Sequence, residues 1–521
     1  MILVYCKKSA QHTGRYRTEY HMLRKSALLK NFMALAASLF LCLPDSAAFA
    51  EPYGIEPLEK GYTAAQSTQL DRSLYADGSR YENPPAELET VRIGIDYGKE
   101  AVGKALFKNF SGGGFALGYY AGGRSFIELF RTEKSSVEVS FSAGGGSWHI
   151  LIDGEYESRD KAEIAALAYG GFAREIDGKH RVLYGSYSSR AEAEKIRDRF
   201  RLPGTAYCSE KGRLSISSGG EIIFSAEEGE TALALLPLEG EKGLTEYGGE
   251  RYHGGFECAL NEAGMLNVIN CVELEDYVKG VIPYEMSYAW PYEALKAQAV
   301  CARTYAVYNQ DKYAEMGFDL TDDTESQVYR GTKEANELSD SAVDSTAGQL
   351  VRWRGEICEV YYFASDGGAT EDGINVFDAD RPYLTGKPDP FEQAVDFTGE
   401  NWSTRRSGEN IAGRLQSRGY EIGTVCALQA EYSDTGNVIA ISFTDIDGNN
   451  LRIQGRECYT TLGLSNCRFH IAQEENSFTF AGSGWGHNCG MSQWGANAMA
   501  SVYGYDYEDI IRFYFTGAYI A

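Results

Sequence analysis

The sequence predicts an α+β protein built from several domains. Its 521 residues exceed the roughly 150 that one domain needs, and 43% of them are apolar, as in globular proteins. Residues 91–95 alternate apolar and polar side chains as a strand does, whereas residues 293–310 repeat apolar side chains at helical spacing. An internal repeat adds a third observation, because it predicts a β-α-β-β-α-β module.

The N-terminal residues predict an export signal. Arg24, Lys25 and Lys30 form a basic region, residues 32–43 are an apolar run, and residues 48–50 give the small-x-small pattern that signal peptidases cut. As a helix, the run spans about 18 Å, short of a bilayer's roughly 30 Å core, so residues 1–50 are interpreted as a cleaved signal peptide. An uncleaved membrane anchor is the alternative, and Met22 is an alternative start.

The net charge and the cysteine pattern argue against several classes of protein. The formal net charge of −25 excludes the basic surface by which proteins bind nucleic acid, and it disfavours anionic lipid. Outside the leader, cysteines occur in odd number at long spacings, without C-x-x-C. This pattern is typical neither of a disulfide framework nor of a zinc module. One or two disulfides, or buried free thiols, both remain open.

Residues 51–90 are polar and rich in turn residues and predict a linker, after which strand-like patterns begin. The repeat follows: residues 154–163 recur at 185–194, with Gly, Tyr, Ser, Arg, Ala and Glu in register. Each copy follows a strand-like run and opens a helix-like one (159–169 and 190–200), with Ser158 and Ser189 as expected N-caps. Residues 147–207 resemble a SPOR-type domain, which implies binding of peptidoglycan glycan strands. A structural insertion without a ligand is the alternative.

Residues 272–305 hold the main candidate for catalysis. Glu285 lies between Pro283 and Pro291, among apolar and aromatic side chains that include Tyr288 and Trp290. A carboxyl in such surroundings is disfavoured as an anion, so its pKa rises and it can act as a general acid. The residues alone leave open a second interpretation, in which Glu285 caps the helix that begins near Pro291. In that helix, one apolar stripe is predicted, consisting of Leu295, Ala299, Ala302 and Ala306.

Residues 272–305 resemble the SpoIID/LytB family in their Leu-acidic-acidic-Tyr segment, the Pro-x-Glu-Met turn and the Ala-Leu-Lys-Ala-Gln-Ala helix. Three later stretches agree, namely residues 327–331, 362–372 and 484–496. The resemblance implies a mixed α/β catalytic region with a β-rich part at 91–120, a SPOR-like insertion at 121–209, and the catalytic region at 210–521. It implies a peptidoglycan lytic transglycosylase in which Glu285 is catalytic. The family also includes amidase enhancers, so a non-catalytic glycan-binding partner of a cell-wall amidase is the alternative.

Further residues are candidates for binding the glycan. They are Gln327, Tyr329, Ser365, Gly367, Gly368, Thr370, Glu371, His487, Ser492, Gln493, Lys296 and Arg303. The glycine turn at 365–368 lets backbone amides approach a ligand, although a plain hairpin turn is the alternative. Lys296, Gln298 and Arg303 could reach the groove from their helix, although a position on the helix surface is the favoured alternative. A third possible function is a two-carboxylate polysaccharide hydrolase with Glu371 or Asp372 as the partner of Glu285.

No cofactor or metal is expected. Many relatives carry Cys, His and Cys before the Gln-Val-Tyr motif, and some bind zinc there. Thr321, Glu325 and Ser326 occupy those places here, and hydroxyls are not zinc ligands. The sequence as a whole therefore predicts an exported, secreted or cell-wall protein that cleaves peptidoglycan glycan strands, with a role in sporulation or cell-wall remodelling.

Overall fold

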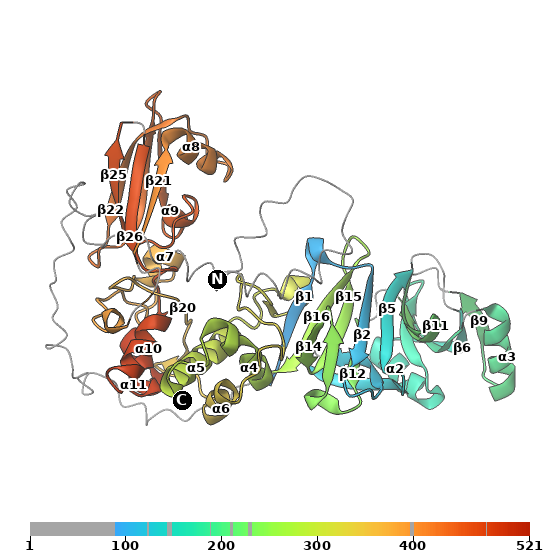
Figure 1. Cartoon of the computed structure of the whole chain (residues 1–521). Coiled ribbons are helices and arrows are strands. Elements are labelled where there is room, and N and C mark those ends of the chain that lie inside the picture. Colours follow the sequence, from blue (N-terminus) through green and yellow to red (C-terminus); the bar gives the residue numbers. More distant parts are fainter. Residues whose placement is uncertain are drawn as a thin grey trace. The chain divides into compact units, whose positions relative to one another are not determined.

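The computed structural model describes residues 89–521, apart from 122–123, 143–147, 188, 209–211, 228–231, 396, 398–400 and 476. The expected signal peptide and the linker up to residue 88 lie outside the described residues. Within the described part of the chain, helices and strands are both abundant, so the predicted α+β class is confirmed (Figure 1). No described helix is both long and apolar enough to cross a membrane.

Two antiparallel-rich sheets form the β region. The seven-stranded sheet has the order β17-β1-β16-β15-β12-β3-β4, and the six-stranded sheet has the order β11-β10-β5-β2-β13-β14. The strands of the first are β17 (Leu320–Thr321), β1 (Thr90–Asp96), β16 (Leu266–Glu273), β15 (Gly255–Leu260), β12 (Leu233–Pro237), β3 (Phe115–Ala121) and β4 (Ser125–Thr132). Those of the second are β11 (Glu221–Glu227), β10 (Arg213–Ser218), β5 (Ser136–Ser142), β2 (Lys104–Asn109), β13 (Leu244–Tyr247) and β14 (Glu250–His253). The strand expected at residues 91–95 is confirmed as part of β1.

Buried and exposed side chains alternate along the strands, and the buried faces of the two sheets pack against each other. In β2, Ala105, Phe107 and Asn109 are buried while the residues between them are exposed. Phe107 meets Phe256 of β15 across the interface, with ring centroids 5.0 Å apart. One hydrophobic core therefore lies between the sheets.

Residues 148–208 form a separate four-stranded antiparallel sheet with the order β7-β8-β6-β9 and two helices. Along the chain the elements are β6 (Trp148–Tyr156), α2 (Arg159–Tyr169), β7 (Phe172–Ile176), β8 (Lys179–Tyr187), α3 (Arg190–Phe200) and β9 (Thr205–Cys208). This is the predicted β-α-β-β-α-β order, and its own core includes Ile150, Val182 and Ala193. The likeness to a SPOR-type domain itself stays a prediction.

The two copies of the repeat begin their helices in the same way. The Ser158 hydroxyl accepts the Lys161 N–H, and the Ser189 hydroxyl accepts the Glu192 N–H, each at 3.3 Å. Both expected N-caps are thus present. A serine oxygen at this position satisfies an amide that the helix cannot pair internally.

The module is inserted at the tip of a β-hairpin. Strands β5 and β10 pair antiparallel, and Ser142 lies directly opposite Arg213. Strands β4 and β5, which fall in the predicted insertion range 121–209, pair within the two large sheets. The separate sheet therefore starts at Trp148.

Helices pack beside the β region. They are α4 (Leu274–Glu285), α5 (Tyr292–Tyr308), α6 (Glu337–Ser345), α7 (Gly373–Phe377), α10 (Gln493–Ser501) and α11 (Tyr507–Tyr514). Short strands accompany them: β18 (Val351–Trp353), β19 (Glu356–Ile357), β28 (Tyr519–Ile520), β20 (Tyr362–Phe363) and β27 (Met491–Ser492). Helix α5 contacts α4, α6, α10 and α11. Its predicted apolar stripe, Leu295, Ala299, Ala302 and Ala306, is fully buried, as expected for a helix enclosed by others.

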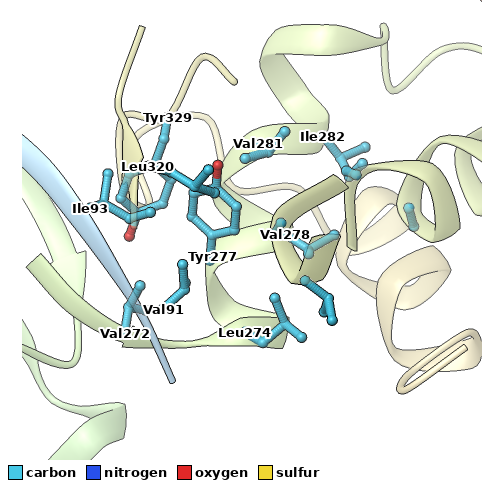
Figure 2. Close-up of a cluster of buried hydrophobic side chains, with 14 of the residues drawn as sticks. Val91, Ile93, Val272, Leu274, Tyr277, Val278, Val281, Ile282, Leu320 and Tyr329 are labelled. Atoms are coloured by element: carbon cyan, nitrogen blue, oxygen red, sulfur yellow. The ribbon is translucent and has the colours of Figure 1, made fainter. Parts of the chain in front are cut away.

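Helix α4 ties the helices to the sheets. Figure 2 shows Val278, Val281 and Ile282 on the helix, and Tyr277 directed toward Tyr329. The rings of these two tyrosines lie 5.0 Å apart, and both are almost completely buried. Since α4 follows β16 without a break, this packing fixes the end of the helix relative to the sheet.

Residues 401–483 contain a further hydrophobic core that the sequence analysis did not separate from the region 210–521. It is built from β21 (Asn401–Ser407), α8 (Gly408–Gln416), β22 (Val425–Tyr432), β23 (Val438–Asp445), β24 (Asn450–Gln454), α9 (Glu457–Thr460), β25 (Phe469–Glu474) and β26 (Ser477–Ser483). Its first and last strands pair, with Asn401 opposite Ser483.

No disulfide joins two of the nine cysteines in the described residues. Cys208 and Cys426 are half-buried and the others are buried. Of the two alternatives left open by the sequence, the structure favours cysteines without disulfides.

Candidate active site

Glu285 is the last residue of α4. Pro283 lies in the final turn of this helix, and Met286 leaves the helical conformation, so the chain turns away directly after the carboxyl. Proline interrupts helical hydrogen bonding, which accounts for the helix ending here. Helix α5 begins at Tyr292 after Pro291, and no side chain caps it. The capping interpretation of Glu285 is therefore not supported.

Three donors from separate parts of the chain reach the Glu285 carboxylate. The Gln493 side-chain amide donates to Oε2 at 3.4 Å. The Tyr362 hydroxyl and the Val328 backbone N–H donate as well. Gln493 begins α10 and Tyr362 begins β20, so residues far apart in the sequence meet at this carboxyl. Gln493, predicted as a binding residue, is thus placed at the site.

A second group of side chains holds these donors. The Gln327 amide donates to the Tyr362 hydroxyl at 2.7 Å and accepts from the Tyr277 hydroxyl at 3.1 Å. The Gln493 amide also lies 3.4 Å from Oε1 of Gln298. Gln327, Tyr277 and Gln298 are buried. The position of Gln327 agrees with its prediction as a site residue, whereas Tyr277 and Tyr362 were not predicted as site residues.

Burial raises the pKa of Glu285, and the hydrogen bonds from Val328, Gln493 and Tyr362 act in the opposite direction. The carbonyl end of a helix also disfavours an anion, which reinforces the upward shift. Among the described residues, the titratable groups in electrostatic contact with Glu285 are the phenols of Tyr277, Tyr305 and Tyr362. A half-buried carboxyl without a described cationic partner can hold a proton near neutral pH and donate it.

Aromatic side chains surround the turn that follows Glu285. The rings of Trp290 and Trp494 lie 4.8 Å apart, and Phe397 lies 5.1 Å from Trp494. Tyr288 is 56% exposed. Partly exposed rings beside an acid offer apolar faces on which a sugar can stack. Phe397 was missed by the sequence analysis, because nothing in its neighbours indicates where it folds.

The hydrogen-bond donors of the turn at residues 365–368 bind acceptors inside the protein. The Ser365 hydroxyl and the Asp366 amide donate to the buried Glu392, and the Gly367 amide approaches it at 3.4 Å. The Gly368 amide donates to Asp366 Oδ1 at 2.6 Å. Gly367 and Gly368 have positive φ angles of 67° and 117°, which glycine adopts without strain. A ligand that binds this turn, as predicted, would therefore have to compete with the hydrogen bonds to Glu392 and Asp366.

Glu392 belongs to a buried group of three carboxylates with Asp366 and Asp389, whose nearest oxygens all lie within 4.8 Å of one another. Burial and the charges of Glu392 and Asp389 raise the pKa of Asp366 well above its ordinary range. Ser492 donates to Glu392 at 2.7 Å, and Tyr514 donates to Asp389 at 2.5 Å. Because hydroxyl and amide donors already occupy Glu392 and Asp389, the set favours a shared proton over a metal ion. Ser492 is therefore placed in this cluster.

Thr370 and Glu371 are also engaged internally. Glu371 is 2% exposed and accepts from Asn375 at 2.8 Å, Ser433 at 2.6 Å and Thr435 at 2.9 Å. The Thr370 hydroxyl accepts the Lys387 N–H at 3.0 Å. These contacts join residues 370–371 to neighbouring segments. No contact of Glu371 or Asp372 with Glu285 is present among the described residues.

His487 is half-buried and neutral. Its Nε2 donates to the Tyr362 carbonyl at 3.1 Å, and its Nδ1 accepts the Cys489 N–H at 3.2 Å. Burial lowers the pKa of His487 to about 3 and raises the pKa of the Cys489 thiol. The pair therefore lacks an activated thiolate, and His487 holds the backbone of Tyr362.

Three predicted site residues lie elsewhere. Arg303 is fully buried and forms a bidentate ion pair with Glu275 at 2.7–2.8 Å, so it is not on a helix surface. Lys296 pairs with Glu293 at 2.7 Å. The Tyr329 hydroxyl donates to Asn270 at 2.9 Å inside the core. None of the three has a described contact with Glu285.

Hydrogen bonds hold the loop that contains Thr321, Glu325 and Ser326. The Ser326 hydroxyl accepts the Thr321 N–H at 3.2 Å, and the Thr321 hydroxyl donates to Asp323 at 3.0 Å. The Lys312 ammonium donates to the carbonyl of Glu325. With Thr321, Glu325 and Ser326 in place of thiolate and imidazole, these hydrogen bonds hold the loop.

Comparison with known proteins agrees with this arrangement. The model of the family "Stage II sporulation protein" matches residues 262–353, which include Glu285 and Gln327. An uncharacterized protein of Brachyspira hyodysenteriae is 35% identical over 286 residues, covering 54% of this chain and 75% of that protein. Stage II sporulation protein D of Bacillus subtilis is 29% identical over 280 residues, covering 48% of this chain and 75% of that protein.

The amidase enhancer of Bacillus subtilis is 27% identical over 291 residues, which is 46% of this chain and 39% of that protein. Each of these three relatives matches about half of the present chain. The family model and these relatives together place the chain in the family of stage II sporulation protein D.

Proposed function

We propose that this protein is an exported lytic transglycosylase that cleaves the glycan strands of peptidoglycan, with Glu285 as its acid and base. The observation that carries the proposal is the environment of Glu285: a half-buried carboxyl with a raised pKa, three hydrogen-bond donors and aromatic neighbours. The relatives named stage II sporulation protein D support a role in the cell wall during sporulation.

The reaction conserves its proton. Protonated Glu285 donates to the oxygen that bridges two sugars, and the C–O bond breaks as positive charge develops on the sugar carbon. The 6-hydroxyl of the same sugar then attacks that carbon and passes its proton to the Glu285 carboxylate. The product ends in a 1,6-anhydro ring, no water enters, and the acid is regenerated.

A single carboxyl suffices for this sequence. A hydrolase with two carboxylates needs a second group that activates water or attacks the sugar. Glu371 and Asp372, the candidates for that role, have no described contact with Glu285, and Glu371 is enclosed by its own donors. The arrangement favours internal attack over hydrolysis.

The name of the amidase enhancer supports a second candidate, a protein that binds glycan and stimulates a cell-wall amidase without cleaving it. In this case Glu285 would bind a sugar hydroxyl rather than transfer a proton. The module at 148–208 is compatible with either role, since a SPOR-type domain would hold the protein on glycan strands whether or not it cleaves them.

The test uses purified protein from residue 51 onward, incubated with denuded glycan strands and analysed by mass spectrometry. The parent is expected to release anhydro-ended fragments, and Glu285→Gln is expected to lose at least about 100-fold in rate. Glu262→Gln, the same change at an exposed loop position, is the matched control and should keep the parent rate.

The outcomes separate the candidates. Products that carry one added water would show a hydrolase and contradict the proposal. Absence of cleavage by the parent, together with stimulation of an added amidase, would show the enhancer function instead.

A further inference from the structure

Tyr362 occupies a special place among the donors to Glu285, because its own hydroxyl receives a hydrogen bond from behind. Its oxygen accepts the Gln327 amide at 2.7 Å, which leaves its O–H free to donate to Glu285. The Gln327 carbonyl oxygen in turn accepts the Tyr277 hydroxyl at 3.1 Å. In this series of hydrogen bonds, from Tyr277 through Gln327 to Tyr362, each donor therefore points toward Glu285.

This series of hydrogen bonds starts and ends on the same helix. Tyr277 and Glu285 belong to the same helix, α4, and lie two turns apart. Gln327 comes from the loop after β17, and Tyr362 opens β20. Three segments are thus joined by hydrogen bonds that begin and end on one helix.

The residues that orient Tyr362 in this series of hydrogen bonds are shielded from solvent. Tyr277 is fully buried and Gln327 is 1% exposed. Burial and the charge of Glu285 raise the pKa of Tyr362, so the phenol keeps its proton. The backbone of Tyr362 is fixed by His487 and by pairing of β20 with β27, Tyr362 opposite Met491. The phenol is therefore held in place before the substrate arrives.

We propose that Tyr362, oriented by Gln327 and Tyr277, is a positioning residue that donates to the Glu285 carboxylate as its proton passes to the glycosidic oxygen. A hydrogen bond to a carboxylate is stronger than one to the neutral acid, so this contact strengthens during the transfer. Such an interaction accelerates the chemical step rather than tightening ground-state binding. The inference rests on the proposed function of Glu285.

The effect on pH dependence has a definite sign. A donor to the anion lowers the pKa of an acid, so removal of the Tyr362 hydroxyl raises the pKa of Glu285. Since the protonated acid is the active form, the alkaline limb of the rate profile then moves to higher pH. The facing titratable groups, Tyr277 and Tyr305, are phenols whose pKa values are raised by burial, and they stay neutral in this range.

The experiment compares three Tyr→Phe variants, each of which keeps its ring and loses one buried hydroxyl. Tyr362→Phe is expected to lower kcat by about 10-fold with KM unchanged and to move the alkaline limb upward. Tyr277→Phe removes the far end of the chain and should act in the same direction, but less. Tyr329→Phe is the matched control: its hydroxyl donates to Asn270, so its rate profile should follow the parent's.

A second measurement does not depend on activity. Carbon-13 labelling of the glutamate carboxyls allows Glu285 to be titrated by NMR in the same protein, with its signal identified by its loss in Glu285→Gln. Its midpoint should rise in Tyr362→Phe and stay unchanged in Tyr329→Phe. If the parent cleaves no glycan but the midpoint rises, the transglycosylase proposal fails while the hydrogen-bond chain stands. An unchanged midpoint and rate profile in Tyr362→Phe would overturn the inference.

Discussion

Two opposing influences act on the carboxyl of Glu285. Burial at the end of α4 favours the protonated acid, whereas hydrogen bonds from Val328, Gln493 and Tyr362 favour the anion. An acid that must first give and then recover a proton benefits from both influences, because burial favours the acid before transfer and the donors stabilise the anion that forms. The balance is a local property of one residue, although its donors come from three other segments.

At Asp366, burial and the charges of Glu392 and Asp389 outweigh the hydrogen bond that the Gly368 amide donates to the carboxyl. Its folded-state pKa is raised, so the folded protein binds more protons than the unfolded chain between the unfolded value of about 3.9 and the raised one. The free energy of unfolding therefore falls as pH rises through that window. Asp366→Asn removes this titration, and its amide can donate to Asp389.

For Asp366→Asn we expect a thermal midpoint that depends less on pH than the parent's and is at least as high at pH 8. Thermal melts across pH 4–9 would check this. Asp447→Asn, a change on an exposed turn, is the control and should follow the parent. A midpoint for Asp366→Asn that falls at every pH by the same amount would contradict the shared-proton interpretation.

At the residue scale the sequence predicted part of the site. The apolar and aromatic neighbours of Glu285 stand next to it in the chain, so its raised pKa could be expected. Tyr277 and Tyr362 could not be predicted as its surroundings, because their contacts depend on how α4 and β20 pack against the loop that holds Gln327. Arg303 was misplaced for the same reason: its charge indicates exposure, but it lies on a face of α5 that α4 and α6 cover.

At the scale of elements, Arg303 joins α5 to α4. It binds both oxygens of Glu275 and also donates to the backbone carbonyls of Val343 and Gln349, which flank the end of α6. Arg303 is fully buried and Glu275 is half-buried, so loss of the guanidinium leaves the carboxylate and both carbonyls without this donor. We expect Arg303→Met to lower the free energy of unfolding by about 3–5 kcal/mol, measured by urea denaturation.

The matched control on the same helix is Lys296→Met. Its ion pair with Glu293 lies nearer the surface, so the expected loss is below about 1 kcal/mol. Equal losses in the two variants would contradict the special role of Arg303. The experiment also separates fold support from catalysis, since surviving Arg303→Met protein should keep the KM of the parent.

Local signals decided which elements could be predicted. The bounds of α2 and α3 agree with the sequence to the residue, because a serine N-cap marks each start. The core of residues 401–483 was not separated, because its strands carry no repeat and their pairing partners are distant. A boundary without a cap, a turn motif or a change in composition leaves no local trace.

At the scale of the whole molecule, the module at 148–208 can be tested by removing it. Since Ser142 and Arg213 are already paired, residues 143–212 can be replaced by an Asn-Gly turn that continues the β5–β10 hairpin. We expect the thermal midpoint of the remaining chain to fall by no more than a few degrees and cleavage of short soluble glycans to continue.

The same variant tests strand recognition. Retention on denuded sacculi should decrease relative to the parent, while retention on intact sacculi should change little, as measured by pull-down. Glu285→Gln is the control for binding without cleavage, and it should be retained like the parent. Equal retention of the deletion variant and the parent would show that the module has a structural role only.

The paired ends of the module also bear on how this protein folds. Before the module is structured, β5 and β10 can meet only by closing a loop of roughly 70 residues, which costs about 3 kcal/mol more than a two-residue turn. Once the module has folded, β6 and β9 bring its ends together, Trp148 opposite Cys208, and most of that entropy has already been lost. The hairpin of the six-stranded sheet should thus assemble late, after the domain that interrupts it.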